Sequence, residues 1–138
     1  MTRAELHAFL RKRRLAVVST IGAASPQAAV VGIAVTDALE IIFDTLTTSR
    51  KYANLRANPR VALVIGWDAE QTEQYEGIAD LPAGADLDAC KQTYFASWPD
   101  GREREQWPDI AYVRIRPRWV RYSDFAVTPP RIEEMRMA

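Results

Sequence analysis

Apolar and polar residues alternate along several short stretches of the chain, which is the spacing of half-buried β-strands. Within residues 39–45, for example, Ile41 and Phe43 alternate with charged residues. Other stretches are rich in Val, Ile or aromatic residues and are bounded by Gly, Pro, Asn or Asp. Together these patterns predict about six strands, over residues 15–20, 28–36, 39–45, 61–65, 74–81 and 110–122.

Three other segments have helical spacing. Thr2 and Glu5 have the form of a capping box, which predicts an N-terminal helix over about residues 3–13. A second helix, over about residues 50–57, should end before Pro59, because the residue preceding a proline avoids the helical region. A third covers residues 86–98 and carries Cys90 on its apolar face, where a thiol is expected to be buried and inert. Residues 99–108 predict a polar loop, and residues 125–138 a C-terminal tail.

Two residues predict irregularities in the strands. Gly77 lies inside the fifth predicted strand and is typical of a bulge, and Pro117 in the last strand requires an edge or a bulge. The chain shows no internal repeat and no linker, so residues 1–138 are expected to form a single domain. Six strands with two or three short helices favour a small β-barrel over a doubly wound sheet.

Charge and composition narrow the classes of function. Acidic and basic residues balance at 18 each, so no net field favours nucleic acid or a membrane surface. One cysteine and one histidine exclude an internal disulfide and make a structural zinc site, with its about four ligands, implausible. We expect no metal, and no apolar run approaches the about 20 residues of a membrane helix. The charged N-terminus lacks a signal-peptide core, so a cytoplasmic location is expected.

The basic run Arg11–Arg14 follows the first predicted helix. Its cations suit the negative end of the helix dipole. Contact with nucleic acid is the alternative, but the rest of the chain has no basic surplus to support it.

A polar turn before the second predicted helix is the strongest candidate for chemistry. Thr48 and Ser49 supply hydroxyls, Arg50 and Lys51 supply fixed cations, and a helix start supplies free backbone N–H groups. A phosphate dianion needs all three kinds of group. The alternative is that a hydroxyl only caps the helix and the cations are solvated. The pattern is not a Gly-rich phosphate loop and lacks the Walker lysine spacing.

The central stretch "LEIIFDTLTTSRKYANLRANPRVALVIGW", Leu39 to Trp67, resembles the pyridoxamine 5'-phosphate oxidase-like, FMN-binding split-barrel superfamily. That family places T-x-x-x-S-R-K between a strand and a short helix, and NPRV at the start of the next strand. The stretches "LAVVSTIGAASPQAAVVGIAV", "YEGIADL" and "YVRIRPRWVRYSDF" resemble its first hairpin, a later strand and its last strand more weakly.

The resemblance implies a mainly β fold, a six-stranded FMN-binding split barrel of Greek-key type, which forms a homodimer with FMN at the interface. It places the phosphate on Ser49, Arg50 and Lys51, and Asp44 and Thr45 along the ribityl chain or ring edge. A ring-binding glutamine of the family falls near Thr72. Backbone groups of the strand starting at residue 28 would meet the flavin ring. The residues expected to contact the ring are Ala28, Ala29, Val30 and Val31.

The chain also departs from the family's oxidase pattern. Ala29 and Ala34 stand where the oxidase has an arginine and a lysine, and no Arg-x-His signature follows Phe125. Oxidation of pyridoxamine phosphate is therefore not expected, and the resemblance implies an FMN-dependent oxidoreductase of unknown substrate with no assigned catalytic residue.

Other ligands and roles stay open at this point. The alternatives are a flavin-binding or sensor protein without turnover and a deazaflavin-dependent reductase on the same fold. Haem would have only His7 and Cys90 as candidate axial ligands. Trp98 is interpreted as a packing side chain in the core or at an interface, with stacking on the flavin as the alternative.

Overall fold

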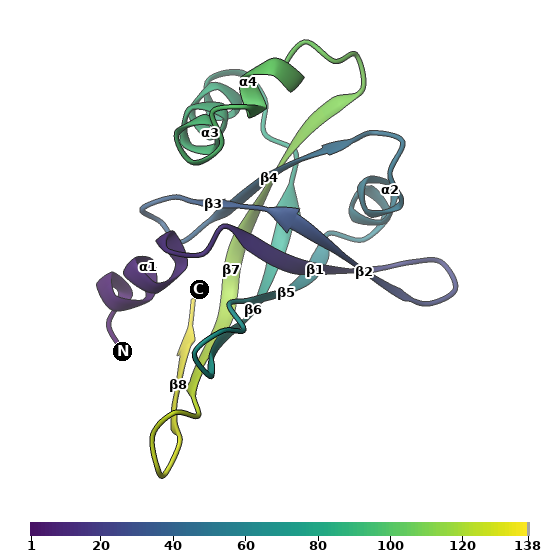
Figure 1. Ribbon diagram of the computed structural model, residues 1–138. Helices are drawn as coiled ribbons and strands as arrows, with labels where there is room; N and C mark the ends of the chain where they lie inside the picture. Colours follow the sequence, from purple (N-terminus) through teal and green to yellow (C-terminus); the bar gives the residue numbers. More distant parts are fainter. Residues whose placement is uncertain (138) are drawn as a thin grey trace.

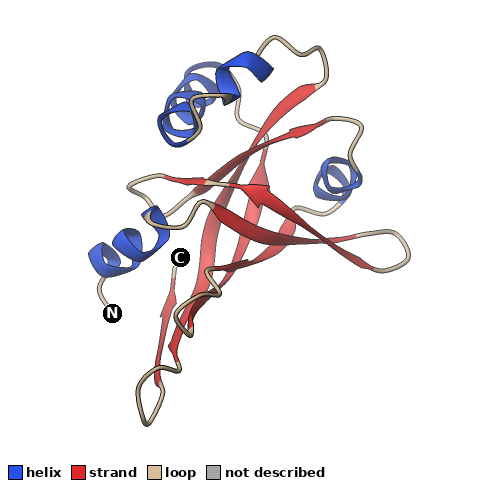
Figure 2. Cartoon of the chain, in the orientation of Figure 1, coloured by secondary structure: helices blue, strands red, loops and turns tan. Residues whose placement is uncertain are grey.

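A curved antiparallel sheet forms most of the protein (Figure 1, Figure 2). In the computed structural model, which describes residues 1–137, the strand order is β2-β1-β5-β6-β7-β4-β3, and β8 pairs with β7. The mainly β class predicted from the sequence is confirmed. The strands are β1 (Leu15–Ile21), β2 (Pro26–Gly32), β3 (Ala34–Val35), β4 (Ile41–Leu46), β5 (Arg60–Ile65), β6 (Gln71–Asp80), β7 (Ile110–Asp124) and β8 (Arg131–Arg136).

The structure corrects the predicted count of six strands to eight among the described residues. The strand predicted over residues 28–36 is divided at Ile33, whose N–H donates to the carbonyl of Arg14 at 2.9 Å in the last contact between the two segments. After this break the chain forms β3, which pairs with β4 rather than with β1. The predicted tail contains β8, which is held by pairing along β7 and by an ion pair between the amino group of Met1 and Glu133. Its last residue, Ala138, lies outside the described residues.

The irregularity predicted at Gly77 and Pro117 is confirmed. Glu76 faces Trp119 and Gly77 faces Pro117, so β7 has one extra residue between the two pairs. Proline fits there because a broken ladder needs no N–H donor. A side chain at Gly77 would place its Cβ 2.4 Å from the carbonyl oxygen of Arg116, so the close approach of the strands requires glycine.

Four helices lie around the sheet: α1 (Arg3–Arg11), α2 (Arg50–Ala57), α3 (Gly84–Ser97) and α4 (Gly101–Arg104). Figure 1 shows α1 and α2 on opposite sides of the sheet and α3 with α4 at its upper end. The predicted capping box of α1 is present, with the Glu5 N–H donating to Thr2 Oγ1 and the Thr2 N–H donating to the Glu5 carboxylate. The segment predicted as a polar loop contains α4, which corrects that interpretation.

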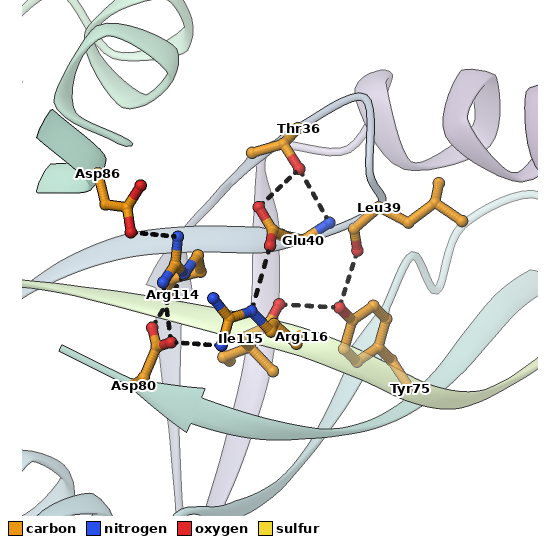
Figure 3. Close-up of polar contacts among 9 residues, drawn as sticks. All are labelled: Thr36, Leu39, Glu40, Tyr75, Asp80, Asp86, Arg114, Ile115 and Arg116. Carbon is orange, nitrogen blue, oxygen red and sulfur yellow. Dashed lines mark hydrogen bonds and ion pairs between the residues drawn. The ribbon is translucent and has the colours of Figure 1, made fainter. Parts of the chain in front are cut away.

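The apolar core has two parts. Inside the curved sheet, Tyr75 is fully buried and its hydroxyl bonds the carbonyls of Leu39 and Ile115 at 2.8 and 3.1 Å (Figure 3). Outside it, α3 packs on β3, β4 and β7 through a second cluster that includes Tyr94 and Cys90. Cys90 is 4% exposed, as its predicted position on an apolar helical face implies.

Candidate phosphate and cofactor site

The start of α2 is fixed by two hydroxyl side chains. Ser49 is the N-cap residue, and its Oγ accepts a hydrogen bond from the N–H of Tyr52 at 3.3 Å. Thr45, at the end of β4, is buried and shares a hydrogen bond with Ser49 at 2.9 Å between the two oxygens. The helix-cap role considered for Ser49 is therefore present in the structure, but it does not involve the two cations that follow.

Arg50 and Lys51 have no carboxylate partner within residues 1–137, since none lies within 4.0 Å of either cation. Both side chains line a cavity of about 90 Å³. This small volume suits a phosphate group rather than a whole flavin. We call it the phosphate cavity; its other lining residues are Val18, Thr20, Gln27, Ala28 and Ala29.

One side chain that sequence reasoning missed joins the two walls of the phosphate cavity. The Asn54 amide in α2 donates to Thr20 Oγ1 in β1 at 3.0 Å and to Gln27 Oε1 in β2 at 2.8 Å. The only local signal was that Asn54 lies four residues after Arg50, on the same side of the helix. Its partners are more than 25 residues away in sequence, so only the tertiary fold identifies them.

The strand β2, where the flavin ring was predicted to lie, is an edge strand of the described sheet. An edge strand leaves a row of backbone N–H and C=O groups unpaired by the sheet. The structure brings Ala28 and Ala29 to the phosphate cavity, and Val30 and Val31 continue the strand away from it. Val30 is 61% exposed, whereas Val31 is buried. At Ala28 and Ala29, β2 thus places an unpaired backbone edge with small side chains beside Arg50 and Lys51, which have no carboxylate partner in residues 1–137.

Asp44 and Thr45 point to opposite faces of β4, as neighbouring strand residues do. The Asp44 carboxylate accepts hydrogen bonds from Arg104 Nε at 2.9 Å and from the Tyr94 hydroxyl at 3.1 Å. Burial and this carboxylate raise the pKa of Tyr94. The described contacts of Asp44 are thus with α3 and α4, and its contact with a ribityl chain stays a prediction.

Thr72 lies near the beginning of β6, opposite Ser123 of β7. It is not among the residues that line the phosphate cavity within one chain. A role for Thr72 in binding the flavin therefore stays a prediction that depends on a second copy of the chain.

A larger cavity of about 670 Å³ lies between α1, β3 and α3. It is lined by Arg11 at the end of α1, by Arg13 and Arg14 after it, by residues 33–37 with Glu40, and by a face of α3; we call it the α1–α3 cavity. Trp98 lies at the end of α3, where its indole N–H donates to the carbonyl of Ile33 at 2.9 Å. A Cβ at Gly32 would approach the Trp98 ring to 2.7 Å, which supports the interpretation of Trp98 as a packing side chain.

Comparison with known proteins shows the family. The model of the pyridoxamine 5'-phosphate oxidase family matches residues 2–124, so the chain belongs to this family. A pyridoxine/pyridoxamine 5'-phosphate oxidase of Bordetella avium is 35% identical over 127 residues, which cover 85% of this chain and 56% of the relative. The chain spans about half the length of the curated relatives it matches.

Solved structures share the split-barrel fold. A haem-binding protein of Mycobacterium smegmatis superposes with a TM-score of 0.82 at 17% identity, covering 99% of this chain and 58% of that protein. A pyridoxamine 5'-phosphate oxidase-related, FMN-binding protein of Nostoc punctiforme has a TM-score of 0.71 at 12% identity, covering 99% and 96%. The predicted superfamily and fold are confirmed.

Residues 1–137 contain no helix with both the length and the apolar character needed to cross a bilayer. In the same residues, no three His, Cys, Asp or Glu side chains are grouped so that they could hold a metal ion.

Proposed function

We propose that the chain binds FMN and acts as an FMN-dependent oxidoreductase whose substrate is unknown. The observation that carries the proposal is the pair Arg50 and Lys51, two cations without carboxylate partners in residues 1–137 that line a phosphate-sized cavity beside an edge strand. Arg50 offers a planar fork of donors and Lys51 a compact charge, which together suit a phosphate monoester. Ser49 and the first N–H groups of α2 would complete the set.

The flavin ring is proposed to lie along β2, over Ala28–Val31. FMN would supply a ring that accepts and returns a hydride or electrons, so the protein needs mainly to position it and set its charge environment. The chain's own contribution is then binding and orientation: the free backbone edge of β2 meets the ring, and α2 holds the phosphate end. We assign no catalytic side chain.

We further propose one domain over residues 1–138, a homodimer with FMN at its interface, and a cytoplasmic location. Support for the dimer comes from an apolar stripe on the outer face of the sheet. Four of its side chains, Leu15, Ile21, Val30 and Val64, are 41% to 61% exposed. Val17 pairs with both Val30 and Val64, so the stripe crosses three strands. In such a dimer, Thr72 of the partner subunit could reach the flavin.

The substrate is proposed to differ from pyridoxamine phosphate. Ala34, which stands where the oxidase has a lysine, is buried in the apolar cluster under α3. Ala29, in place of the oxidase's arginine, is among the residues that line the phosphate cavity. An anionic group on the substrate would therefore not find, at positions 29 and 34, the arginine and lysine that the oxidase has there.

Haem is less well supported. His7 and Cys90 both line the α1–α3 cavity, but His7 Nε2 lies 3.5 Å from an Asp37 oxygen, and burial raises the pKa of the Cys90 thiol. The His7 ring already contacts a carboxylate, and a raised pKa keeps the Cys90 thiol from forming the thiolate that binds a metal. A deazaflavin would use the same phosphate cavity as FMN.

The visible spectrum of the purified protein, before and after titration with FMN, tests the proposal. A flavin spectrum with saturable binding supports it, and a Soret band would instead identify haem. Reduction of the bound flavin by a nicotinamide cofactor would distinguish an oxidoreductase from a protein that only binds the flavin.

A further inference from the structure

The α1–α3 cavity combines charges of both signs. Three arginines, Arg11, Arg13 and Arg14, line it from the end of α1 and the turn that follows. Three carboxylates, those of Asp37, Glu40 and Asp86, line it from the opposite segments. The kind of ligand that fits depends on which of these charges are already paired within the protein.

The carboxylates have partners in the protein, and Figure 3 shows most of them. Arg114 is 9% exposed and binds both oxygens of Asp80 at 3.0 and 2.9 Å, while its third nitrogen lies 3.8 Å from Asp86. Arg116 links Asp80, at 2.9 Å, to Glu40, at 3.6 Å.

The two remaining contacts involve a neutral hydroxyl and a fully exposed carboxylate. The hydroxyl of Thr36 donates to Glu40 at 3.3 Å, and Asp37 lies 3.5 Å from His7. Arg114 and Arg116 therefore offset part of the negative charge of the acidic wall.

The three arginines have no such partners. Within residues 1–137, no carboxylate lies within 4.0 Å of Arg11, Arg13 or Arg14. Arg13 lies over the ring of Phe9 at 3.9 Å, and its buried Nε has no hydrogen-bond partner there. Arg14 lies over Trp98 at 4.0 Å, and Arg11 is exposed in the last turn of α1.

Stacking on an aromatic ring fixes a guanidinium group without using its in-plane donors. Arg13 and Arg14 are therefore held in place by Phe9 and Trp98 and keep hydrogen-bond donors available. A ligand that meets preorganised donors loses less conformational entropy on binding. The five arginines at the cavity, Arg11, Arg13, Arg14, Arg114 and Arg116, outnumber the four carboxylates Asp37, Glu40, Asp80 and Asp86, so the net charge there is positive.

We propose that the α1–α3 cavity binds a small organic anion through its carboxylate or phosphate group, with Arg11, Arg13 and Arg14 as the donors. The concave shape and the volume of about 670 Å³ suit a metabolite-sized molecule rather than an extended polymer. The site is separate from the phosphate cavity at Arg50 and Lys51, so the proposal does not depend on the flavin.

Lys12 provides a matched control. It belongs to the same basic run and carries the same charge, but it is exposed and does not line the cavity. A nucleic acid lying on the basic run would use Lys12 together with its neighbours, because backbone phosphates recognise clustered cations without regard to a cavity. An anion inside the cavity would not.

The test is calorimetric titration of citrate, and separately of inorganic phosphate, into the full chain at constant ionic strength. Wild type should bind at least one probe saturably. Arg14→Ala and Arg11→Ala should each weaken that binding about tenfold or more, as expected for loss of a charge-assisted hydrogen bond. Arg14→Lys, which keeps the charge but loses the fork, should lie between. Lys12→Ala should stay within about twofold of wild type.

Three outcomes would overturn the proposal. The first is that neither probe binds wild type saturably. The second is that Lys12→Ala weakens binding as much as Arg14→Ala, which would indicate a polyanion surface. The third is that Arg50→Ala abolishes binding, which would place the anion in the phosphate cavity. Circular dichroism checks folding; Arg11 is exposed, so Arg11→Ala remains informative if Arg14→Ala does not fold.

Discussion

The side-chain amide of Asn54 donates a hydrogen bond to Gln27 Oε1 at 2.8 Å, and this contact ties α2 to the edge strand β2. The same amide donates to Thr20 in β1, whose side chain is buried. One residue thus holds the helix that carries Arg50 and Lys51 against the strands that form the opposite wall of the phosphate cavity.

Asn54→Ala should lower the free energy of unfolding by roughly 1–3 kcal/mol, because it leaves the buried Thr20 hydroxyl and the Gln27 amide without their donor. Urea denaturation followed by circular dichroism measures the change. Arg56→Ala, an exposed position on the same helix, serves as the control and should change little. Equal stability of Asn54→Ala and wild type would show that this link contributes nothing.

Arg50→Ala and Lys51→Ala should each weaken FMN binding roughly ten- to a hundredfold, because a hydrogen bond to a charged group contributes about 1.5–3 kcal/mol. Riboflavin, which lacks the phosphate, should bind poorly to wild type and change little in either variant. Fluorescence titration of the apoprotein measures both ligands, with Arg56→Ala as the control. If both variants fold and bind FMN as tightly as wild type, the phosphate site lies elsewhere.

The chain should be a homodimer at micromolar concentration, with an interface of roughly 2,000 Å² or more. Val30→Asp should disrupt it without unfolding the chain, because Val30 is 61% exposed and lies on the apolar stripe. Light scattering gives the mass, and Glu76→Gln is a control at an exposed, polar position of the same sheet. A monomeric wild type that still binds FMN would contradict the proposed interface.

Flavin-loaded protein should be reduced by dithionite and reoxidised by air, yet convert little pyridoxamine phosphate to pyridoxal phosphate. The reason is the replacement of two oxidase cations by Ala29 and Ala34. Product absorbance under multiple-turnover conditions measures the activity. Efficient turnover would show that the chain supplies the missing cations from other positions.

Glu73 predicts an unusual pH dependence of stability. Its side chain is fully buried in β6 between Ile65 and Tyr122, and neither carboxylate oxygen has a hydrogen-bond partner among the described residues. Burial raises the pKa of Glu73 from 4.5 to about 8. Below pH 4.5 the carboxyl is protonated in both the folded and the unfolded chain, so its ionisation does not lower the free energy of unfolding. Between pH 4.5 and about 8 the unfolded chain ionises first, so stability is lost progressively as pH rises.

Glu73→Gln should remove this pH-dependent loss. The stability of the variant relative to wild type should therefore increase by on the order of a few kcal/mol across that interval. Urea denaturation at a series of pH values measures the two slopes, and the exposed Glu76→Gln on the same strand is the control. Parallel stability curves for Glu73→Gln and wild type would show that Glu73 is ionised in the folded protein.

Much of the fold could be predicted because it depends on local rules. The capping box at Thr2, the end of α2 before Pro59 and the bulge at Gly77 and Pro117 each follow from the conformations or hydrogen bonds that those residues allow. The alternation of apolar and polar residues located most of the strands. The Ser49–Lys51 segment could be identified because a hydroxyl and two cations at the start of a helix are recognised without any distant partner.

The sequence by itself thus determined most of the segments that form strands and helices, and it indicated one turn as a candidate phosphate site. Only the tertiary structure decided what lies opposite those segments. The break at Ile33, the pairing of β8 and the Asn54 bridge all depend on groups distant in sequence. So does the lack of a carboxylate partner for Arg50 and Lys51 within residues 1–137. The same holds for Arg11–Arg14: the local pattern explains them as cations at a helix end, whereas folding places three of them around a cavity. Hydrophobic burial and ion pairing act between neighbours in space, and that neighbourhood is not encoded in any short stretch of the chain.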